Sequence, residues 1–553
     1  MFTRLRLWLA AHPRWTLALL VLATLGPFLA KPFNIDDPLF IWLAQHVRAH
    51  PENPFGFQVN WYGLLSPMWA VTENPPLAGY YFAVAGSVFG WSEISLHLAG
   101  LLAALAVILG THRLAARLCG NPLLAAGAVL FTPVFLVSAN TVMCDVPMLA
   151  FWVWAVVFWV EGLEQNSSAK LIAAGLLVAL AMLTKYFGVA LVPLLAAHGA
   201  MQKRQLGGWA AALLIPVATF GAYQWFTQSF YGHAMFSTAA QFVVAAHRKQ
   251  GFSPVARGVI ALAFTGGGAA SAVFLALWLC RPRTLAVVAG STAMVIGALC
   301  FGGFVLKKYV ALEDNAARAE VAAQLIFWAI GGVLILGLAA ADIWRNPRAG
   351  QAWLLGLWIG GTFVFTAFGN WTVNGRSVLP LVPAAGILLA RRWEAGARKW
   401  PRAMQVSLAA GALLALLVAE ADFQLATVVR RSAEEVVAKY GSEKRTLWFE
   451  GHWGFQFYME QLGARAVDYK TFEPAPGDLL IMPLHNTYIN APKPDIVARR
   501  ELLSVPNPAV LTTWNAAAGA GFYSSVAGPL PFGFGKVPPE SLFIYELKAA
   551  EAK

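Results

Sequence analysis

The stretch ISLHLAGLLAALAVILGT, residues 94–111, decides the class of fold. It contains no Asp, Glu, Lys or Arg, and a helix of this length extends about 27 Å, close to the ~30 Å hydrocarbon core of a bilayer. Similar apolar runs recur along the chain, where 58% of the residues are hydrophobic and only 12% are charged. The sequence therefore predicts a mainly α-helical protein that crosses a membrane many times.

Thirteen transmembrane helices are predicted, each ending at charged residues, Pro or Gly. They are placed at residues 15–30, 94–111, 122–139, 146–160, 170–184, 187–201, 207–226, 257–280, 284–304, 321–341, 350–369, 377–391 and 403–421.

The distribution of basic residues predicts the orientation of these helices. Of the 27 Lys and Arg residues in 1–422, seventeen fall in the short loops of one face, which identifies that face as cytoplasmic and places the N-terminus there. These residues are Arg4, Arg6, Arg14, Arg113, Arg117, Lys170, Lys203, Arg204, Arg281, Arg283, Arg345, Arg348, Arg391, Arg392, Arg398, Lys399 and Arg402. We expect a multi-pass membrane protein with its N-terminus in the cytoplasm.

Two domains are predicted. Residues 1–422 form the membrane domain, with a first outer loop at 31–93, and residues 423–553 form a small extracytoplasmic α/β domain. The second region has 13 basic and 13 acidic residues, and the segments 446–449 and 478–482 have the pattern of strands, with a helix-like stretch at 455–462 between them. The fourteen-residue apolar stretch 77–90 is too short to span and is predicted to be interfacial or re-entrant.

The formal charge of +12 does not indicate a nucleic-acid partner. The whole excess lies in residues 1–422, where there are 27 basic and 15 acidic residues, and it follows the loops of one membrane face. Four cysteines without pairing or metal-ligand spacing predict no disulfide framework.

Asp36 and Asp37 follow the first predicted span directly. Asp37 with Pro38 after it fits an N-cap and the first position of a helix, and that structural role competes with a functional one. Asp36 has no such role. Adjacent acids in a medium of reduced dielectric raise the pKa of one of them, which suits a proton acceptor.

Asp145 repeats this pattern, since Val146-Pro147 and an apolar run follow it. Capping and function are both open for this residue. Two predicted spans separate it from Asp36, which returns the chain to the same face. Acids at the edge of a membrane are scarce and tend to face a cavity.

Lys185 and Arg376 lie on the face where basic residues are disfavoured. Snorkelling to lipid headgroups is the alternative for Lys185, but a phosphate partner explains both cations, and the planar guanidinium of Arg376 suits phosphate oxygens.

Other polar and aromatic residues carry weaker signals. His233, His247, His452 and His485 lack metal-ligand spacing and are expected at the surface or in loops. Trp61 and other tryptophans of the first outer loop fit interfacial anchoring, and stacking on a sugar is the alternative.

The order of these motifs resembles the GT-C membrane glycosyltransferases of the protein O-mannosyltransferase and aminoarabinose lipid A transferase type. The resemblance covers roughly residues 15–392. It is carried by Asp36-Asp37 after the first span, Pro75-Pro76-Leu77, Asp145 before an apolar run, Lys185 beyond the next hairpin, and Arg376 with Pro380 and Pro383. The chain departs from the family in having Asn74 where aminoarabinose transferases often have Lys, and Asp37 where the family has Glu.

The resemblance implies a sugar transferase that uses a polyprenyl-phosphate-linked donor in a membrane. Asp36, Asp37 and Asp145 are the expected catalytic residues, with Asp36 nearest to the chemistry, and Lys185 and Arg376 are expected at the donor phosphate. No cofactor is implied with certainty, and a divalent cation held by the three aspartates stays open. The acceptor, a lipid, glycan or protein, is not identified.

Two functions of other classes remain as alternatives. A lipid or glycan transporter, or flippase, would share the helical bundle and its buried charges, although no internal repeat is evident. A phosphotransferase acting on lipid headgroups would need a nucleophile or a denser metal cluster than the chain shows.

Overall fold

The structure is a computed structural model, and it describes residues 11–72, 74–203, 207–312, 315–396, 401–441 and 445–548. Among the basic residues that predict the orientation, Arg4, Arg6, Arg204, Arg398 and Lys399 lie outside these ranges.

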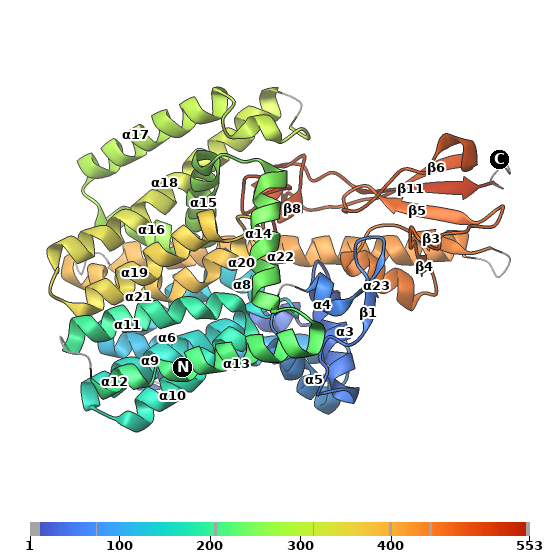
Figure 1. Ribbon diagram of the computed structural model, residues 1–553. Coiled ribbons are helices and arrows are strands. Elements are labelled where there is room, and N and C mark those ends of the chain that lie inside the picture. The colour runs from blue at the N-terminus through green and yellow to red at the C-terminus, as the bar shows by residue number, and fades with distance from the viewer. Residues whose placement is uncertain are drawn as a thin grey trace.

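A bundle of roughly parallel and antiparallel helices forms the larger part of the molecule (Figure 1). Each of the thirteen predicted spans contains at least one helix of this bundle. The helices are α2 (Pro13–Leu25), α6 (Glu93–Leu118), α7 (Pro122–Leu130), α8 (Pro133–Ala139), α9 (Asp145–Gln165), α10 (Ser168–Thr184), α11 (Leu191–Lys203), α12 (Gly208–Ala211), α13 (Leu214–Tyr231), α15 (Pro254–Gly268), α16 (Ala270–Leu279), α17 (Pro282–Phe301), α18 (Asn315–Arg345), α19 (Gly350–Val364), α20 (Gly375–Val378), α21 (Val382–Gly396) and α22 (Pro401–Tyr440).

The described part of the chain has seven helices long and apolar enough to cross a membrane by themselves. Two further pairs qualify if each bent pair is one crossing: α7 with α8, bent by 65°, and α15 with α16, bent by 88°. Shorter apolar helices are α2, α10 and the helix Leu77–Phe89. The prediction of a polytopic helical membrane protein is confirmed, and the count of thirteen crossings is consistent with the structure.

The two ends of the bundle carry different contacts. Helix α6 begins at Glu93, which accepts a hydrogen bond from Tyr458 of the C-terminal region at 3.0 Å. Near its other end, about 30 Å away by helical rise, Arg113 contacts Glu161 at 2.8 Å. The predicted cytoplasmic residues Arg113 and Lys170 thus meet around Glu161 at the end remote from the C-terminal region.

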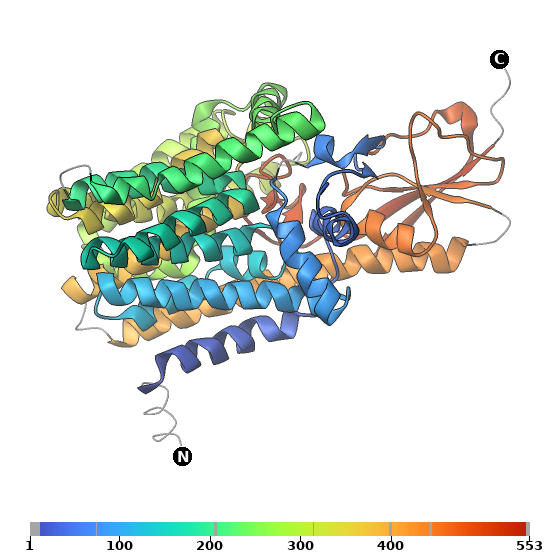
Figure 2. The ribbon, with the colours of Figure 1, turned by 60° about the horizontal axis from the view of Figure 1, so that its bottom comes forward.

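The first outer loop folds between the bundle and the C-terminal region (Figure 2). It contains α3 (Asp37–Ala49), the short hairpin of β1 (Gln58–Asn60) and β2 (Leu65–Pro67), α4 (Met68–Val71) and α5 (Leu77–Phe89). Helix α5 follows Pro76, has only thirteen residues and packs against α3 and α6.

The C-terminal region contains a five-stranded sheet in the order β4-β3-β5-β11-β6. Strands β3 (Leu447–Phe449) and β5 (Leu479–Pro483) are parallel neighbours, and α23 (Trp453–Gln461) lies between them in sequence, as the pattern predicts. The remaining strands of this sheet are β4 (Arg465–Ala466), β6 (Val497–Val505) and β11 (Glu540–Leu547). The predicted small α/β region is confirmed.

Two connections join this region to the bundle. Helix α22 runs without a break through the predicted boundary at 422/423 and extends beneath the sheet (Figure 1). Residues 511–535, here called the returning segment, leave the sheet after β6 and pack against the bundle, so that β8 (Trp514–Asn515) lies apart from β5 and β11. The Gly375 N–H donates to Phe522 O at 2.7 Å, and the Ser525 N–H donates to Val373 O at 2.8 Å. The division into two domains stays a prediction.

Candidate functional site

Asp36 and Arg376 form an ion pair at the end of the bundle that faces the C-terminal region. The Arg376 Nη1 atom lies 2.9 Å from Asp36 Oδ2, and the two side chains are 13% and 27% exposed. Arg376 sits in the first turn of α20, which Asn374 caps by accepting the Ser377 N–H. The pair is therefore partly exposed at this end of the bundle.

Asp145 and Lys185 form a second pair. Lys185 Nζ lies 2.5 Å from Asp145 Oδ1, and the carboxylate is 1% exposed. Asp145 is the first residue of α9, and the N-cap is Cys144, so the expected capping by Asp145 is corrected. Its carboxylate is directed instead to Lys185, which follows the last residue of α10.

Residues 143–144 bring the two pairs together. Arg376 Nη1 lies 3.0 Å from the Met143 sulfur, two positions before Asp145. The Cys144 thiol lies 3.6 Å from Asn74 Oδ1, which places the Pro75-Pro76-Leu77 motif beside the same loop. Four residues predicted from separate loops therefore occupy one end of the bundle.

This cluster keeps polar atoms without a protein partner. Asp145 Oδ2 and Arg376 Nε are buried and have no hydrogen-bond partner among the residues that the structure describes. Buried polar groups usually have hydrogen-bond partners. The free N–H of Arg376 and the free carboxylate oxygen of Asp145 are therefore suited to bind a polar ligand. Lys185, which pairs with Asp145 and is 21% exposed, supplies further N–H donors to this cluster.

Asp37 has a different position from Asp36. The helix starts one residue earlier than expected, with Asp36 as N-cap and without a side-chain cap. The Asp37 carboxylate is fully buried and accepts the N–H of Asn34 at 3.0 Å and that of Val142 at 2.8 Å. Burial raises the pKa of Asp37 to about 7, although Lys31 and these N–H groups lower it. Asp37 therefore joins the first outer loop to the loop before Asp145.

The aspartates do not fit a shared metal site in this arrangement. The described ranges contain no group of three or more His, Cys, Asp or Glu side chains placed to hold a metal ion. The carboxylates of Asp36 and Asp145 each face a cation, and that of Asp37 faces two N–H groups. We derive no chemical step from a metal ion.

A buried network beside the site involves residues that sequence reasoning missed. Lys31 and Asp422 form an ion pair, with 1% and 2% of their side chains exposed. Asp422 also accepts the hydroxyls of Thr513 at 2.6 Å and Tyr523 at 2.9 Å. The available signals were Lys31 directly after the first predicted span, and Asp422, with Glu420 two positions before it, directly after the last.

Tyr523 connects this network to the ion pair of Asp36. Its ring centroid lies 5.8 Å from the Arg376 guanidinium carbon, a distance at which a cation is attracted to an aromatic face. The returning segment therefore contributes a side chain to the cluster, although it comes from the C-terminal region.

Comparison with known proteins supports the resemblance drawn from the motifs. Residues 73–221 match the model of the family described as dolichyl-phosphate-mannose-protein mannosyltransferase. This range contains Asn74, the Pro-Pro-Leu motif, Asp145 and Lys185. The comparison with curated protein sequences gives no significant match.

Similar solved structures include two of ArnT from Cupriavidus metallidurans. The apo structure has a TM-score of 0.41 at 15% identity, and the structure bound to undecaprenyl phosphate has a TM-score of 0.40 at 15% identity. Each comparison covers 86% of this chain and 93% of the other. The arabinofuranosyltransferase AftD from mycobacteria has a TM-score of 0.39 at 14% identity, over 99% of this chain and 40% of that chain.

Proposed function

We propose that this membrane protein transfers a sugar from a polyprenyl-phosphate-linked donor to an acceptor at the outer face of the bacterial inner membrane. The observation that carries the proposal is the convergence of two acid–cation pairs and two unpaired buried polar atoms at one end of a helical bundle. The matched family model adds support, because its description names a sugar carried on a polyprenyl phosphate.

Arg376 and Lys185 bind the donor phosphate in this proposal. The donor is a phosphodiester with one negative charge and two non-bridging acceptor oxygens, so it can replace Asp36 and Asp145 as the partner of these cations. The polyprenyl phosphate that leaves is a monoester with more negative charge, so the same cations stabilise the leaving group. The unpaired Arg376 Nε supplies an additional N–H donor without breaking an existing contact. The polyprenyl chain lies among the helices, in contact with membrane lipid.

Asp36 is the proposed general base. When phosphate engages Arg376, the carboxylate of Asp36 loses its partner and accepts the proton of the acceptor hydroxyl or amine. The acceptor atom bonds to the anomeric carbon, the bond from that carbon to the phosphate oxygen breaks, and polyprenyl phosphate leaves with inversion at carbon. Asp145 orients the sugar through its unpaired Oδ2 atom.

A strain comparison tests the function. Lipids, glycans and glycoproteins from a deletion strain are compared by mass spectrometry with those of the same strain carrying the wild-type chain or the variant Asp36→Asn. We expect one hexose, pentose or amino-sugar mass to disappear on deletion and to return only with the wild-type chain, since loss of a positioned base costs about 10² to 10⁴ in rate.

Glu52→Gln is the matched control, because Glu52 is an exposed acid of the same outer loop. It should restore the missing mass. Full restoration by Asp36→Asn would contradict the role of Asp36. Transport of a lipid or glycan by the purified protein across vesicles, without a new glycosidic bond, would favour the transporter over the transferase.

A further inference from the structure

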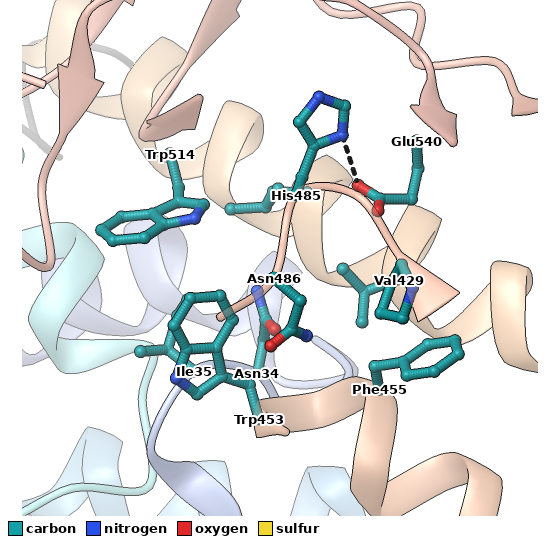
Figure 3. Close-up of a pocket in the computed structure, with 11 residues that line it drawn as sticks. Asn34, Ile35, Val429, Trp453, Phe455, His485, Asn486, Trp514 and Glu540 are labelled. Atoms are coloured by element: carbon teal, nitrogen blue, oxygen red, sulfur yellow. Dashed lines mark hydrogen bonds and ion pairs between the residues drawn. The ribbon is translucent and has the colours of Figure 1, made fainter. Parts of the chain in front are cut away.

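A pocket lies between the first outer loop, α22 and the C-terminal region, and its lining includes none of the residues of the proposed sugar transfer. It encloses about 390 Å³ of space between atoms, part of it open to solvent. Its lining includes Asn34, Trp453, His485, Trp514 and Glu540. Figure 3 shows the indoles of Trp453 and Trp514 on one side of this pocket, and Phe455 with Val429 on the other.

The aromatic side chains are arranged as a row. The ring centroids of Trp514 and Trp453 lie 5.3 Å apart, those of Trp453 and His452 4.8 Å, and those of His452 and Trp61 4.6 Å. Trp61 lines a second pocket of about 250 Å³, together with Tyr469 and Tyr488. The row therefore connects two pockets along the contact between the first outer loop and the C-terminal region.

Polar groups accompany these rings. Asn34 lines the first pocket and is 4% exposed, and within the described part of the chain its Oδ1 atom has no hydrogen-bond partner. His485 Nδ1 lies 3.2 Å from Glu540 Oε2, and the two side chains lie together at one edge of the same pocket (Figure 3). Aromatic faces combined with a few fixed amide and carboxylate groups suit a ligand that has apolar C–H faces and hydroxyl edges.

The backbone is strained at two residues of this lining. Ile35 has φ = 53° and Trp453 has φ = 67°, in the left-handed region that is an outlier for β-branched and bulky residues. Backbone strain of this kind is unfavourable and gathers at ligand sites. Because Ile35 lies between Asn34 and Asp36, its conformation sets the placement of the pocket relative to the ion pair with Arg376.

We propose that the first pocket binds a pyranose unit of a glycan acceptor against the partly buried Trp453 and Trp514, with the units that follow extending toward the second pocket. The inference rests on the proposed function, since it names the acceptor of the same reaction. Asn34 and Ile35 directly precede Asp36, and neighbouring Cα atoms lie about 3.8 Å apart. The lining of the pocket therefore ends one residue before the proposed base.

Binding of free sugars by the full-length protein tests the proposal. The protein is held in lipid nanodiscs, because glucoside and maltoside detergents would compete. Saturation-transfer NMR is recorded with the methyl glycosides of glucose, galactose, mannose and N-acetylglucosamine and with their oligosaccharides. We expect transfer to the ring C–H protons of at least one sugar, stronger for its oligosaccharide.

Three variants locate the binding. Trp514→Ala and Glu540→Gln should weaken binding by about fivefold or more, and Glu540→Gln preserves the side-chain shape if the tryptophan variant does not fold. Trp91→Ala is the matched control, since Trp91 is a partly buried tryptophan of the first outer loop outside the pocket. Absence of transfer from every sugar, or equal effects of Trp91→Ala and Trp514→Ala, would overturn the proposal.

Stabilisation by undecaprenyl phosphate separates this inference from the proposed function. The Trp514→Ala protein should be stabilised by this lipid as much as the wild type. If the lipid stabilises the wild type and no sugar binds, only the acceptor pocket is refuted. If sugar binds and the lipid has no effect, the proposed donor is refuted. In cells, loss of the sugar mass from the lipid fraction or from the glycoprotein fraction in the Trp514→Ala strain identifies the carrier of the glycan.

Discussion

At the scale of single residues, Asp36 and Asp37 show how neighbouring acids acquire different roles. The Asp36 side chain is partly exposed and forms an ion pair with Arg376. The Asp37 carboxylate is fully buried and accepts two backbone N–H groups from separate loops. Of the two adjacent aspartates, Asp37 is the one whose pKa is raised, and its oxygens are inaccessible to a substrate. The accessible carboxylate is the better candidate for the base.

Asp37→Asn tests the structural role. The amide can accept only one of the two N–H groups, and an unpaired buried donor costs about 1–3 kcal/mol. We expect a lower thermal unfolding temperature, measured in detergent by differential scanning fluorimetry. Asp36→Asn, the matched variant, should keep the wild-type temperature within about a degree or two. Equal unfolding temperatures of the two variants would show that Asp37 has no structural role beyond that of Asp36.

Arg376→Lys tests the phosphate site. Lysine keeps the charge and loses the planar fork, so the affinity for undecaprenyl phosphate should fall by about 10- to 100-fold, from the loss of about 1.5–3 kcal/mol in charged hydrogen bonds. The measurement is the concentration of lipid needed for thermal stabilisation. Arg48→Lys, at an exposed arginine of α3, is the control. Unchanged affinity in Arg376→Lys would remove Arg376 from the donor site.

At the scale of elements, Asp478 connects the parallel pair of β3 and β5. Its carboxylate accepts the N–H groups of Thr446, Ala475 and the Trp448 indole at 2.7–3.0 Å. Burial raises its pKa, but these donors and Arg465 outweigh burial and bring the pKa below its ordinary value. The ionised form is therefore favoured in the folded sheet.

This arrangement predicts acid sensitivity of the sheet. A lowered native pKa contributes stability above the unfolded-state pKa of about 3.9, and the contribution is lost as the pH falls through the native value. We expect hydrogen exchange of the β3 and β5 amides, corrected for intrinsic rates, to accelerate below about pH 4. Asp478→Asn should accelerate it already at pH 7, with a smaller further change in acid, while amides of α9 serve as the internal control. Identical pH profiles of hydrogen exchange for the wild type and Asp478→Asn would show that Asp478 does not stabilise the pair of β3 and β5.

At the scale of the whole molecule, one buried network joins the start of the first outer loop, the middle of α22 and the returning segment. Lys31, Asp422, Thr513 and Tyr523 are far apart in sequence and meet beside Arg376. The position of the returning segment is therefore coupled to the geometry of the proposed donor site.

A double-mutant cycle measures the coupling between Lys31 and Asp422, the ion pair of this network. Lys31→Met leaves the Asp422 charge buried without its cation, and such a loss costs about 3–5 kcal/mol. Lys31→Met combined with Asp422→Leu should recover much of the thermal stability lost by the single variant. Additive losses in the double variant, read from unfolding temperatures, would show that the pair is not coupled.

The sequence by itself determined the membrane class, the helical segments, the strands β3 and β5 and the candidate residues Asp36, Asp145, Lys185 and Arg376. These conclusions depend on local properties, namely the length of apolar runs, the period of hydrophobic residues and the charges between them. Local patterns do not specify which distant side chains meet. Only the tertiary structure decided that Asp36 pairs with Arg376, that Asp37 is inaccessible, and that Tyr523 of the returning segment packs beside Arg376, because each contact joins residues more than one hundred positions apart in the chain.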